Sequence, residues 1–249
     1  MDSQDIKEMS ADCQEIIEKL REMSSEKYKK NVVKLGIPEQ DSIGVSTGDV
    51  RKLAKAVGKS DALARELWKT GLHEAKLLAV LLYDRKTVSL SEAAALMDQM
   101  YSWDLCDHLC KNLLIKLPGY QDLIGGWRDS ERLYCRRAAF TLIASAAVHE
   151  KELPDSQADQ YLQWIWECSD DGREHVKKAV SWALRELGKR DFDLQERAVA
   201  LARELAAHGS KAQAWIGRDA LKELENLVQA EGRGRLISTN TQMGRDAVK

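Results

Sequence analysis

Proline, phenylalanine and long hydrophobic runs are scarce in this sequence. It contains three prolines and two phenylalanines among 249 residues. The longest nearly apolar stretch, residues 138–148, includes Thr141 and Ser145 and is too short to span a bilayer. The opening residues MDSQDIKEMS are acidic and lack the apolar centre of a secretion signal. We therefore expect an intracellular protein that is neither exported nor embedded in a membrane.

A strong net charge and an even set of cysteines are also missing. Five cysteines suit a reducing compartment rather than a disulfide scaffold. The formal charge is −2 at pH 7, so the chain as a whole does not attract nucleic acid, and any nucleic-acid site must depend on local clusters. One such cluster lies at residues 173–190, where six basic residues stand against Glu174 and Glu186. The alternative is that these cations form an ordinary solvated helix face.

The composition favours helices. Strand-forming residues are few, whereas Ala, Leu, Glu, Lys and Arg dominate, so we expect an all-α fold. A helix pair recurring every 30–45 residues favours a helical-repeat solenoid over a compact bundle. We expect a single domain over residues 1–230. Residues 231–249 are polar and interrupted by glycine, which predicts a disordered tail. The expected helices are 12–22, 24–35, 47–57, 60–70, 72–85, 89–101, 103–116, 120–127, 130–148, 155–168, 171–189 and 193–230 with breaks.

Common cofactor motifs are absent. The sequence has neither the GxxxxGK[ST] phosphate loop nor a GxGxxG turn between a strand and a helix. Cys106, His108 and Cys110 are the closest approach to a metal site. Neighbours two residues apart point to opposite sides of a helix, so His108 cannot join the two thiols there. We expect no metal and no cofactor, and interpret the cysteines as buried small apolar residues.

Two segments combine residue types suited to chemistry. In YSWDLCDHLC, Trp103 and Asp107 are four residues apart and share one helix face. In WRDSERLYCRRAAF, Arg136 and Arg137 enter an apolar helix, where an arginine needs an anionic partner. That partner is either a carboxylate of the protein or a bound phosphate, and periodicity does not choose between the two arginines.

A third segment, VKKAVSWALRELGKR, places an indole among cations. Trp182 lies between small residues and is flanked by Lys177, Lys178 and Arg185. Interleaved basic and aromatic side chains are typical of nucleic-acid surfaces.

Five segments in a fixed order carry a family resemblance. They are LGIPEQDSIGVSTGDVRKLAK, RELW at 65–68, SWDLCD at 102–107, WRDSERLYCRRAAF and KKAVSWALRELGKRD, and they cover most of residues 34–191. Together they resemble the DNA alkylation repair family of HEAT-like-repeat DNA glycosylases. The resemblance implies an all-helical solenoid whose concave, basic face wraps duplex DNA. It also implies excision of cationic purines such as N3-methyladenine and N7-methylguanine in base excision repair, with no base pocket.

The resemblance also assigns roles to residues. The tryptophan and aspartate of the family's W-x-x-x-D element fall on Trp103 and Asp107, and a further tryptophan falls on Trp182; these three are the expected catalytic residues. The arginine before Ala-Ala is Arg137, which is expected to hold a phosphate. The other expected DNA contacts are Arg136, Lys177, Lys178 and Arg185. The expected partner is duplex DNA containing alkylated purines.

Two alternatives to a glycosylase are open at this point. Some members of such a family bind DNA without excising a base, and helical repeats also serve as scaffolds for protein partners. An open groove and the lack of a heptad seam favour a monomer.

Overall fold

The computed structural model describes residues 9–34 and 36–249, and most of their regular structure is helical. Within these ranges there are fourteen α-helices, three short 3-10 helices and one pair of two-residue strands, which confirms the predicted all-α fold. No helix in this part of the chain is long and apolar enough to cross a membrane. Residues 1–8 and residue 35 lie outside these ranges. The first belong to the opening segment in which we found no secretion signal, and the second is the expected end of a helix.

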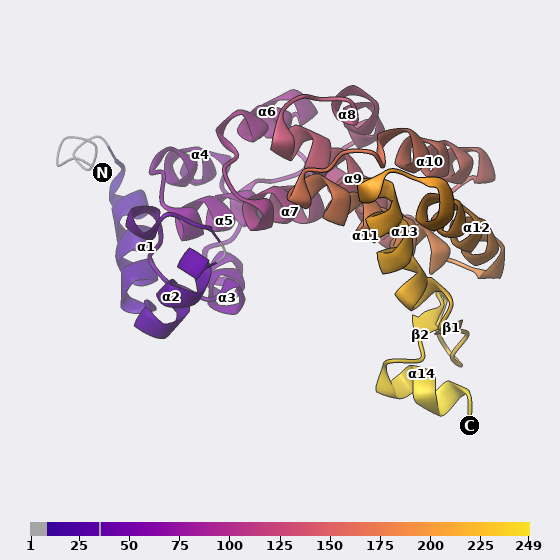
Figure 1. Cartoon of the computed structure of the whole chain (residues 1–249). Coiled ribbons are helices and arrows are strands. Elements are labelled where there is room, and N and C mark those ends of the chain that lie inside the picture. Colours follow the sequence, from indigo (N-terminus) through magenta and orange to yellow (C-terminus); the bar gives the residue numbers. More distant parts are fainter. Residues whose placement is uncertain (1–8, 35) are drawn as a thin grey trace. The chain divides into compact units, whose positions relative to one another are not determined.

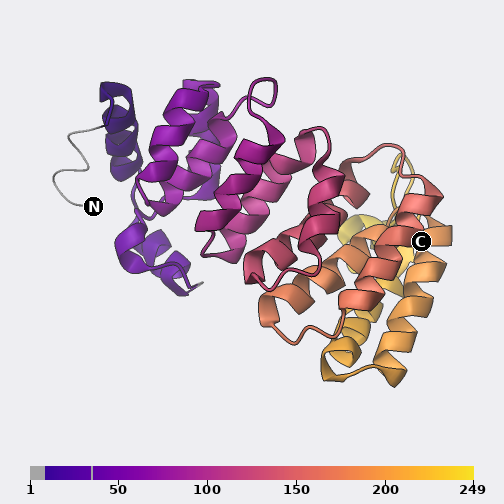
Figure 2. The ribbon, with the colours of Figure 1, turned by 90° about the horizontal axis from the view of Figure 1, so that it is seen from above.

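The contacts divide the chain into two compact units, Met1–Gly119 and Tyr120–Lys249, each of which is described by itself. The prediction of a single domain stays a prediction. In the N-terminal unit the central element is α5, which is buried on nearly every side and packs against α3, α4 and α7 (Figures 1 and 2). The elements of this unit are α1 (Ala11–Glu22), α2 (Glu26–Lys34), η2 (Glu39–Asp41), α3 (Thr47–Val57), α4 (Asp61–Lys69), α5 (His73–Leu82), α6 (Leu90–Ala95), η3 (Leu96–Gln99), α7 (Trp103–Asn112) and η4 (Leu114–Lys116).

A buried carboxylate fixes the loop before α3. Glu74, in the first turn of α5, accepts hydrogen bonds from the backbone N–H groups of residues 43, 44 and 45 at 2.7–3.1 Å and from the Ser42 hydroxyl. Its side chain is 1% exposed. Gly44 has φ +93°, and a Cβ there would lie 2.8 Å from the Cβ of Lys29, so the loop can approach α2 only with glycine at this position.

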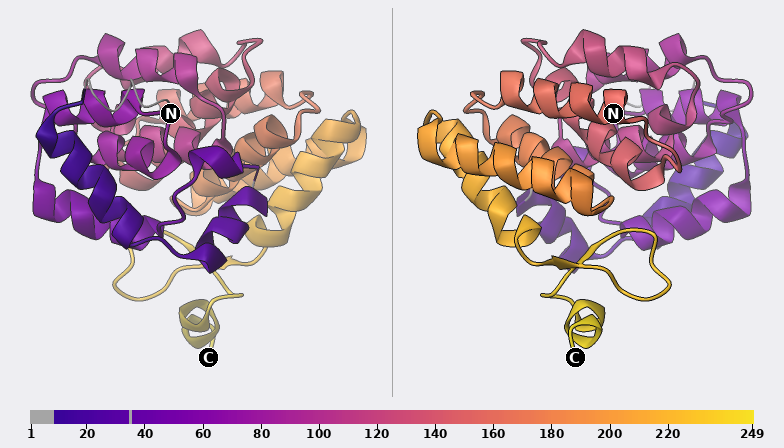
Figure 3. Two further views of the ribbon diagram at one scale, coloured as in Figure 1. Left: turned by 90° about the vertical axis from the view of Figure 1, so that its left-hand side faces the viewer. Right: turned by 90° about the vertical axis from the view of Figure 1, so that its right-hand side faces the viewer.

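In the C-terminal unit, α9 is the buried helix. It packs against α8 and along α11, and α11 in turn packs against α12 and α13, which lie side by side (Figure 3). The β1–β2 hairpin follows α13, and α14 packs against both strands. The elements are α8 (Tyr120–Trp127), α9 (Leu133–His149), α10 (Asp155–Cys168), α11 (Glu174–Gly188), α12 (Phe192–His208), α13 (Lys211–Leu224), β1 (Leu227–Val228), β2 (Ile237–Ser238) and α14 (Gln242–Ala247).

The end of the chain differs from the sequence-based expectation. Residues 231–249, expected to be a disordered tail, include β2 and α14. The Leu236 side chain is 2% exposed, and its N–H donates to the Lys189 carbonyl at 2.8 Å. Gly244 packs so closely on Ser238 that a Cβ would overlap its carbonyl oxygen. A few apolar and small residues therefore hold a segment whose overall composition is polar.

We expect Glu74→Ala to destabilise the fold by about 3 kcal/mol or more, because it leaves three buried N–H donors without an acceptor. Glu15→Ala is the matched control. The Glu15 side chain is 62% exposed and pairs with the exposed Lys19, so its loss should change the free energy of unfolding by less than about 0.5 kcal/mol. Urea unfolding followed by circular dichroism measures both. Equal midpoints for the two variants would contradict the role of Glu74.

Candidate functional site

Helix α7 carries the first two predicted catalytic residues. It begins at Trp103, after Ser102 in extended conformation, and Asp107 follows one turn later. Asp107 is 8% exposed and Trp103 is partly exposed. Helical geometry places side chains four residues apart on one face, so an indole and a carboxylate are neighbours along α7.

The start of α7 is tied to α5 by a buried histidine. The His73 ring is 1% exposed, with Nε2 2.9 Å from Asp104 Oδ2 and Nδ1 3.0 Å from the Tyr101 hydroxyl. Burial raises the pKa of Asp104, but the hydrogen bond and charge of His73 outweigh it, and the pKa lies below its usual value. These contacts join residues about thirty positions apart, and they fix the first turn of α7, where Trp103 lies.

His108 follows Asp107 and is a packing residue. Its Nε2 is 3.0 Å from the Leu77 carbonyl, and its Nδ1 is 3.2 Å from the Asn112 side-chain amide. Nε2 therefore donates and Nδ1 accepts, which requires the neutral ring. Burial, together with the charge of Arg51, lowers the pKa of His108 to about 4. Cys106 and Cys110 are fully buried. In residues 9–34 and 36–249 no three His, Cys, Asp or Glu side chains are arranged to hold a metal ion.

In the C-terminal unit, Arg136 and Arg137 have different partners, although the sequence did not distinguish between them. Arg136 pairs with the Asp171 carboxylate at 3.3 Å, next to Arg173, which binds the same carboxylate at 2.6 Å. Arg137 is 6% exposed, and its Nη1 donates to the backbone carbonyl of His175 at 2.7 Å. Arg136 thus has a carboxylate of the protein as a partner, and the hydrogen bond of Arg137 joins α9 to the first turn of α11.

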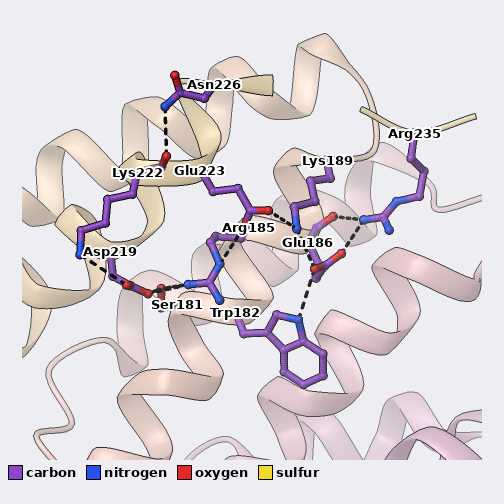
Figure 4. A network of polar contacts seen from close by, with 10 residues as sticks. All are labelled: Ser181, Trp182, Arg185, Glu186, Lys189, Asp219, Lys222, Glu223, Asn226 and Arg235. Atoms are coloured by element: carbon purple, nitrogen blue, oxygen red, sulfur yellow. Dashed lines mark hydrogen bonds and ion pairs between the residues drawn. The ribbon is translucent and has the colours of Figure 1, made fainter. Parts of the chain in front are cut away.

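Trp182 belongs to a polar network on α11 (Figure 4). Its indole N–H donates to Glu186 Oε1 at 3.3 Å. Glu186 also pairs with Lys189 at 3.0 Å and with Arg235 at 2.9 Å. Burial raises the pKa of Glu186, but the two cations lower it by more than burial raises it. The pKa therefore lies below its usual value, and the carboxylate is ionised. The network holds the partly exposed indole in one orientation.

The remaining predicted DNA contacts also have partners in the protein. Arg185 pairs with Asp219 at 2.5 Å and with Glu223 at 3.1 Å, and its side chain is 23% exposed. Lys177 and Lys178 share the Glu174 carboxylate at 2.6 and 3.0 Å. The cationic cluster at residues 173–190 is therefore largely neutralised by carboxylates.

Sequence reasoning missed three partners in this network. Asp219 and Glu223 lie on α13, and Arg235 lies in the β1–β2 loop, all more than thirty residues from the α11 side chains that they contact. Glu186 alone had a local signal, because it lies four residues after Trp182.

Comparison with known proteins gives one family and one related structure. The family model described as "DNA alkylation repair enzyme" matches residues 16–224. A solved structure described as "A new family of proteins related to the HEAT-like repeat DNA glycosylases with affinity for branched DNA structures" is similar with a TM-score of 0.72. The identity is 22%, and the match covers 84% of this chain and 94% of that chain. None of the curated proteins matches this chain. The likeness confirms the predicted HEAT-like fold.

Stability should depend on pH through His108. The pKa is about 4 in the folded chain and about 6.5 when unfolded, so between these values the unfolded chain binds more protons. The free energy of unfolding is therefore highest above about pH 6.5 and falls by up to roughly 3 kcal/mol as the pH drops toward 4. Urea unfolding at several pH values should show this decline reduced in His108→Gln and retained in His208→Gln, since His208 is exposed. The same decline in all three proteins would exclude His108 as its cause.

Arg185 should act mainly in stability. Arg185→Ala removes one of the two cations that pair with each of two partly buried carboxylates, and we expect a loss of about 2 kcal/mol. Lys178→Ala removes an exposed cation and should cost less than about 0.5 kcal/mol. Urea midpoints of the two variants give the comparison. A midpoint of Arg185→Ala equal to that of Lys178→Ala would show that the network contributes nothing.

Proposed function

Because the chain belongs to the DNA alkylation repair enzyme family, we propose that it is a DNA glycosylase that removes cationic N3- and N7-alkylated purines from duplex DNA. The observation that carries the proposal is the Trp103 and Asp107 pair on α7. The carboxylate is 8% exposed and lies one helical turn from the partly exposed indole. A negative charge beside an aromatic face is suited to a cationic sugar.

The chemistry makes modest demands on the protein. An alkylated purine already carries a positive charge, so when the bond from C1′ to the base nitrogen breaks, the electron pair neutralises the leaving base. The deoxyribose then becomes an oxocarbenium ion. In the proposal Asp107 stabilises that cation and orients a water molecule, whose oxygen bonds to C1′ while its proton passes to the carboxylate and on to solvent. The stabilisation is larger at a buried carboxylate than in water.

Surrounding contacts support the assignment of Asp107 and Trp103. The partly buried hydrogen bonds of His73 with Asp104 and Tyr101 hold the first turn of α7. A fixed helix keeps the catalytic charge in place before the reaction, which lowers the cost of reorganisation. Family resemblance assigns Trp182 a second contact with the sugar and Arg137 a contact with a flanking phosphate. The hydrogen bond from Trp182 to Glu186 is consistent with a fixed aromatic face.

Binding of DNA without excision is the second candidate. The related solved protein is described as having affinity for branched DNA structures. In this chain, Arg136, Lys177, Lys178 and Arg185 all pair with carboxylates. Such pairing reduces the attraction for phosphate, so the number of basic residues alone does not set the affinity for DNA.

Asp107→Asn tests the catalytic proposal. The variant keeps the shape of the side chain and removes its charge, so release of base should fall at least ~100-fold. The assay measures free 7-methylguanine and 3-methyladenine released from methylated duplex DNA, by chromatography. Asp12→Asn, which removes an exposed carboxylate of α1, is the control and should act like the wild type.

The outcomes separate the candidates. Release by wild type and Asp12→Asn, with loss in Asp107→Asn, supports the glycosylase. Equal release by all three proteins would remove Asp107 from the mechanism. If no protein releases base above spontaneous depurination while wild type binds duplex or branched DNA with a salt-dependent affinity, the second candidate is favoured. A protein scaffold would show no such DNA affinity.

A further inference from the structure

A cationic pocket of about 370 Å³ lies in the C-terminal unit, outside the predicted catalytic residues. It joins the loop and first turn around α11 to the first two turns of α13. Its lining is formed by Gly172, Lys177, Lys211, Ala212, Trp215 and Arg218. Three of these six residues have cationic side chains and none carries a carboxylate.

Three of the lining side chains share one face of α13. Lys211, Trp215 and Arg218 are related by steps of four and three residues, which places them in one row along the helix. Lys177 enters from α11, with its ammonium group 4.7 Å from the centre of the Trp215 ring. The indole is therefore an apolar wall between cations.

Lys211 and Arg218 differ from the other cations discussed above. Both are exposed, and within the described ranges neither side chain makes a hydrogen bond or an ion pair with the protein. The ammonium group of Lys177 forms an ion pair with the Glu174 carboxylate at 2.6 Å. By contrast, Arg185 on the neighbouring helix is bound by two carboxylates. An arginine and a lysine without carboxylate partners, at the rim of a pocket, are suited to an anion with several acceptor oxygens.

We propose that this pocket binds a phosphodiester group of DNA. Arg218 presents a planar pair of N–H donors to two phosphate oxygens, Lys211 adds a second charge, and the Trp215 indole packs against the adjoining deoxyribose. The proposal rests on the DNA binding proposed above. It assigns that binding to residues that lie outside the five quoted segments, which end at residue 191, with only Lys177 in common.

The test is the salt dependence of DNA affinity in the double variant Lys211→Gln, Arg218→Gln. Glutamine is a good helix former, and the capping box of Ser210 and Gln213 that begins α13 is untouched. Anisotropy of a labelled, undamaged duplex gives Kd at several salt concentrations. Loss of two phosphate contacts should reduce the slope of log K against log salt by about 2 and weaken binding roughly 50-fold at 0.1 M salt.

The control is the double variant Arg203→Gln, Lys249→Gln. It removes the same two residue types and the same charge, but both side chains are exposed and paired with carboxylates outside the pocket. Its slope should equal that of the wild type. Equal slopes for the two double variants would overturn the proposal. Wild type without any DNA affinity would overturn the proposed function as well, so the two failures are distinguishable.

A second arm distinguishes DNA from free phosphate as the source of the anion. Inorganic phosphate is titrated into the wild-type protein while the indole N–H signal of Trp215, identified by its loss in Trp215→Phe, is followed by NMR. A phosphate-dependent shift that disappears in Lys211→Gln, Arg218→Gln, together with the reduced DNA slope, supports the site. The same shift with an unchanged DNA slope would identify a site for free anions and overturn the assignment to DNA.

Discussion

The burial of α9 is the constraint on which the C-terminal unit depends. Most of its residues are buried, and α8 and α11 pack against it, so its polar groups cannot rely on water and must find partners inside the protein. Ser145 donates to the carbonyl one turn earlier, and Arg137 donates to His175. At the other end, Arg190 donates to the carbonyls of Ala147 and Glu150. The same bonds that satisfy α9 attach it to both ends of α11, and α11 carries Trp182 and Arg185.

Helices were predictable where their signals are local. The bounds of α3, α8 and α10 agree with those expected from the sequence, and at the start of α3 the Ser46 side chain accepts a hydrogen bond from the Asp49 N–H. Two predicted helices, at 89–101 and 103–116, instead end in 3-10 segments. The C-terminal hairpin and α14 were not predicted, because the contacts that order them are not local. Backbone bonds from Leu236 to Lys189 and from Thr239 to Asn226, together with the close packing of Gly244, hold a polar segment, and none of these contacts can be read from composition.

The residues of the candidate site were likewise predictable only where their signal is local. The Trp103 and Asp107 spacing follows from helix geometry alone, so sequence reasoning reaches it directly. The contact of His73 with Asp104 joins positions 31 residues apart and leaves no local pattern. Cation clusters are the least predictable feature, since the charge of a cluster such as residues 173–190 depends on carboxylates of other helices. Arg185 is an example. Its sequence context predicts an exposed DNA contact, but in the structure its guanidinium group forms ion pairs with Asp219 and Glu223 on α13.

Burial of the carboxylate partner decides which paired cations can exchange their partner for a phosphate. The pair of Lys178 and Glu174 is more than half exposed on both sides, so a phosphate can replace Glu174 at small cost, because water then solvates the released carboxylate. Releasing Arg185 would leave Asp219 with Lys222 at 4.0 Å and Glu223 with Lys189 at 2.7 Å. Both carboxylates are about a quarter exposed, so the loss of one of their two cations opposes the exchange. Lys211 and Arg218 need no exchange at all. A net charge of −2 is therefore compatible with the DNA binding proposed above, which depends on a few local cations such as Lys211 and Arg218 rather than on overall charge.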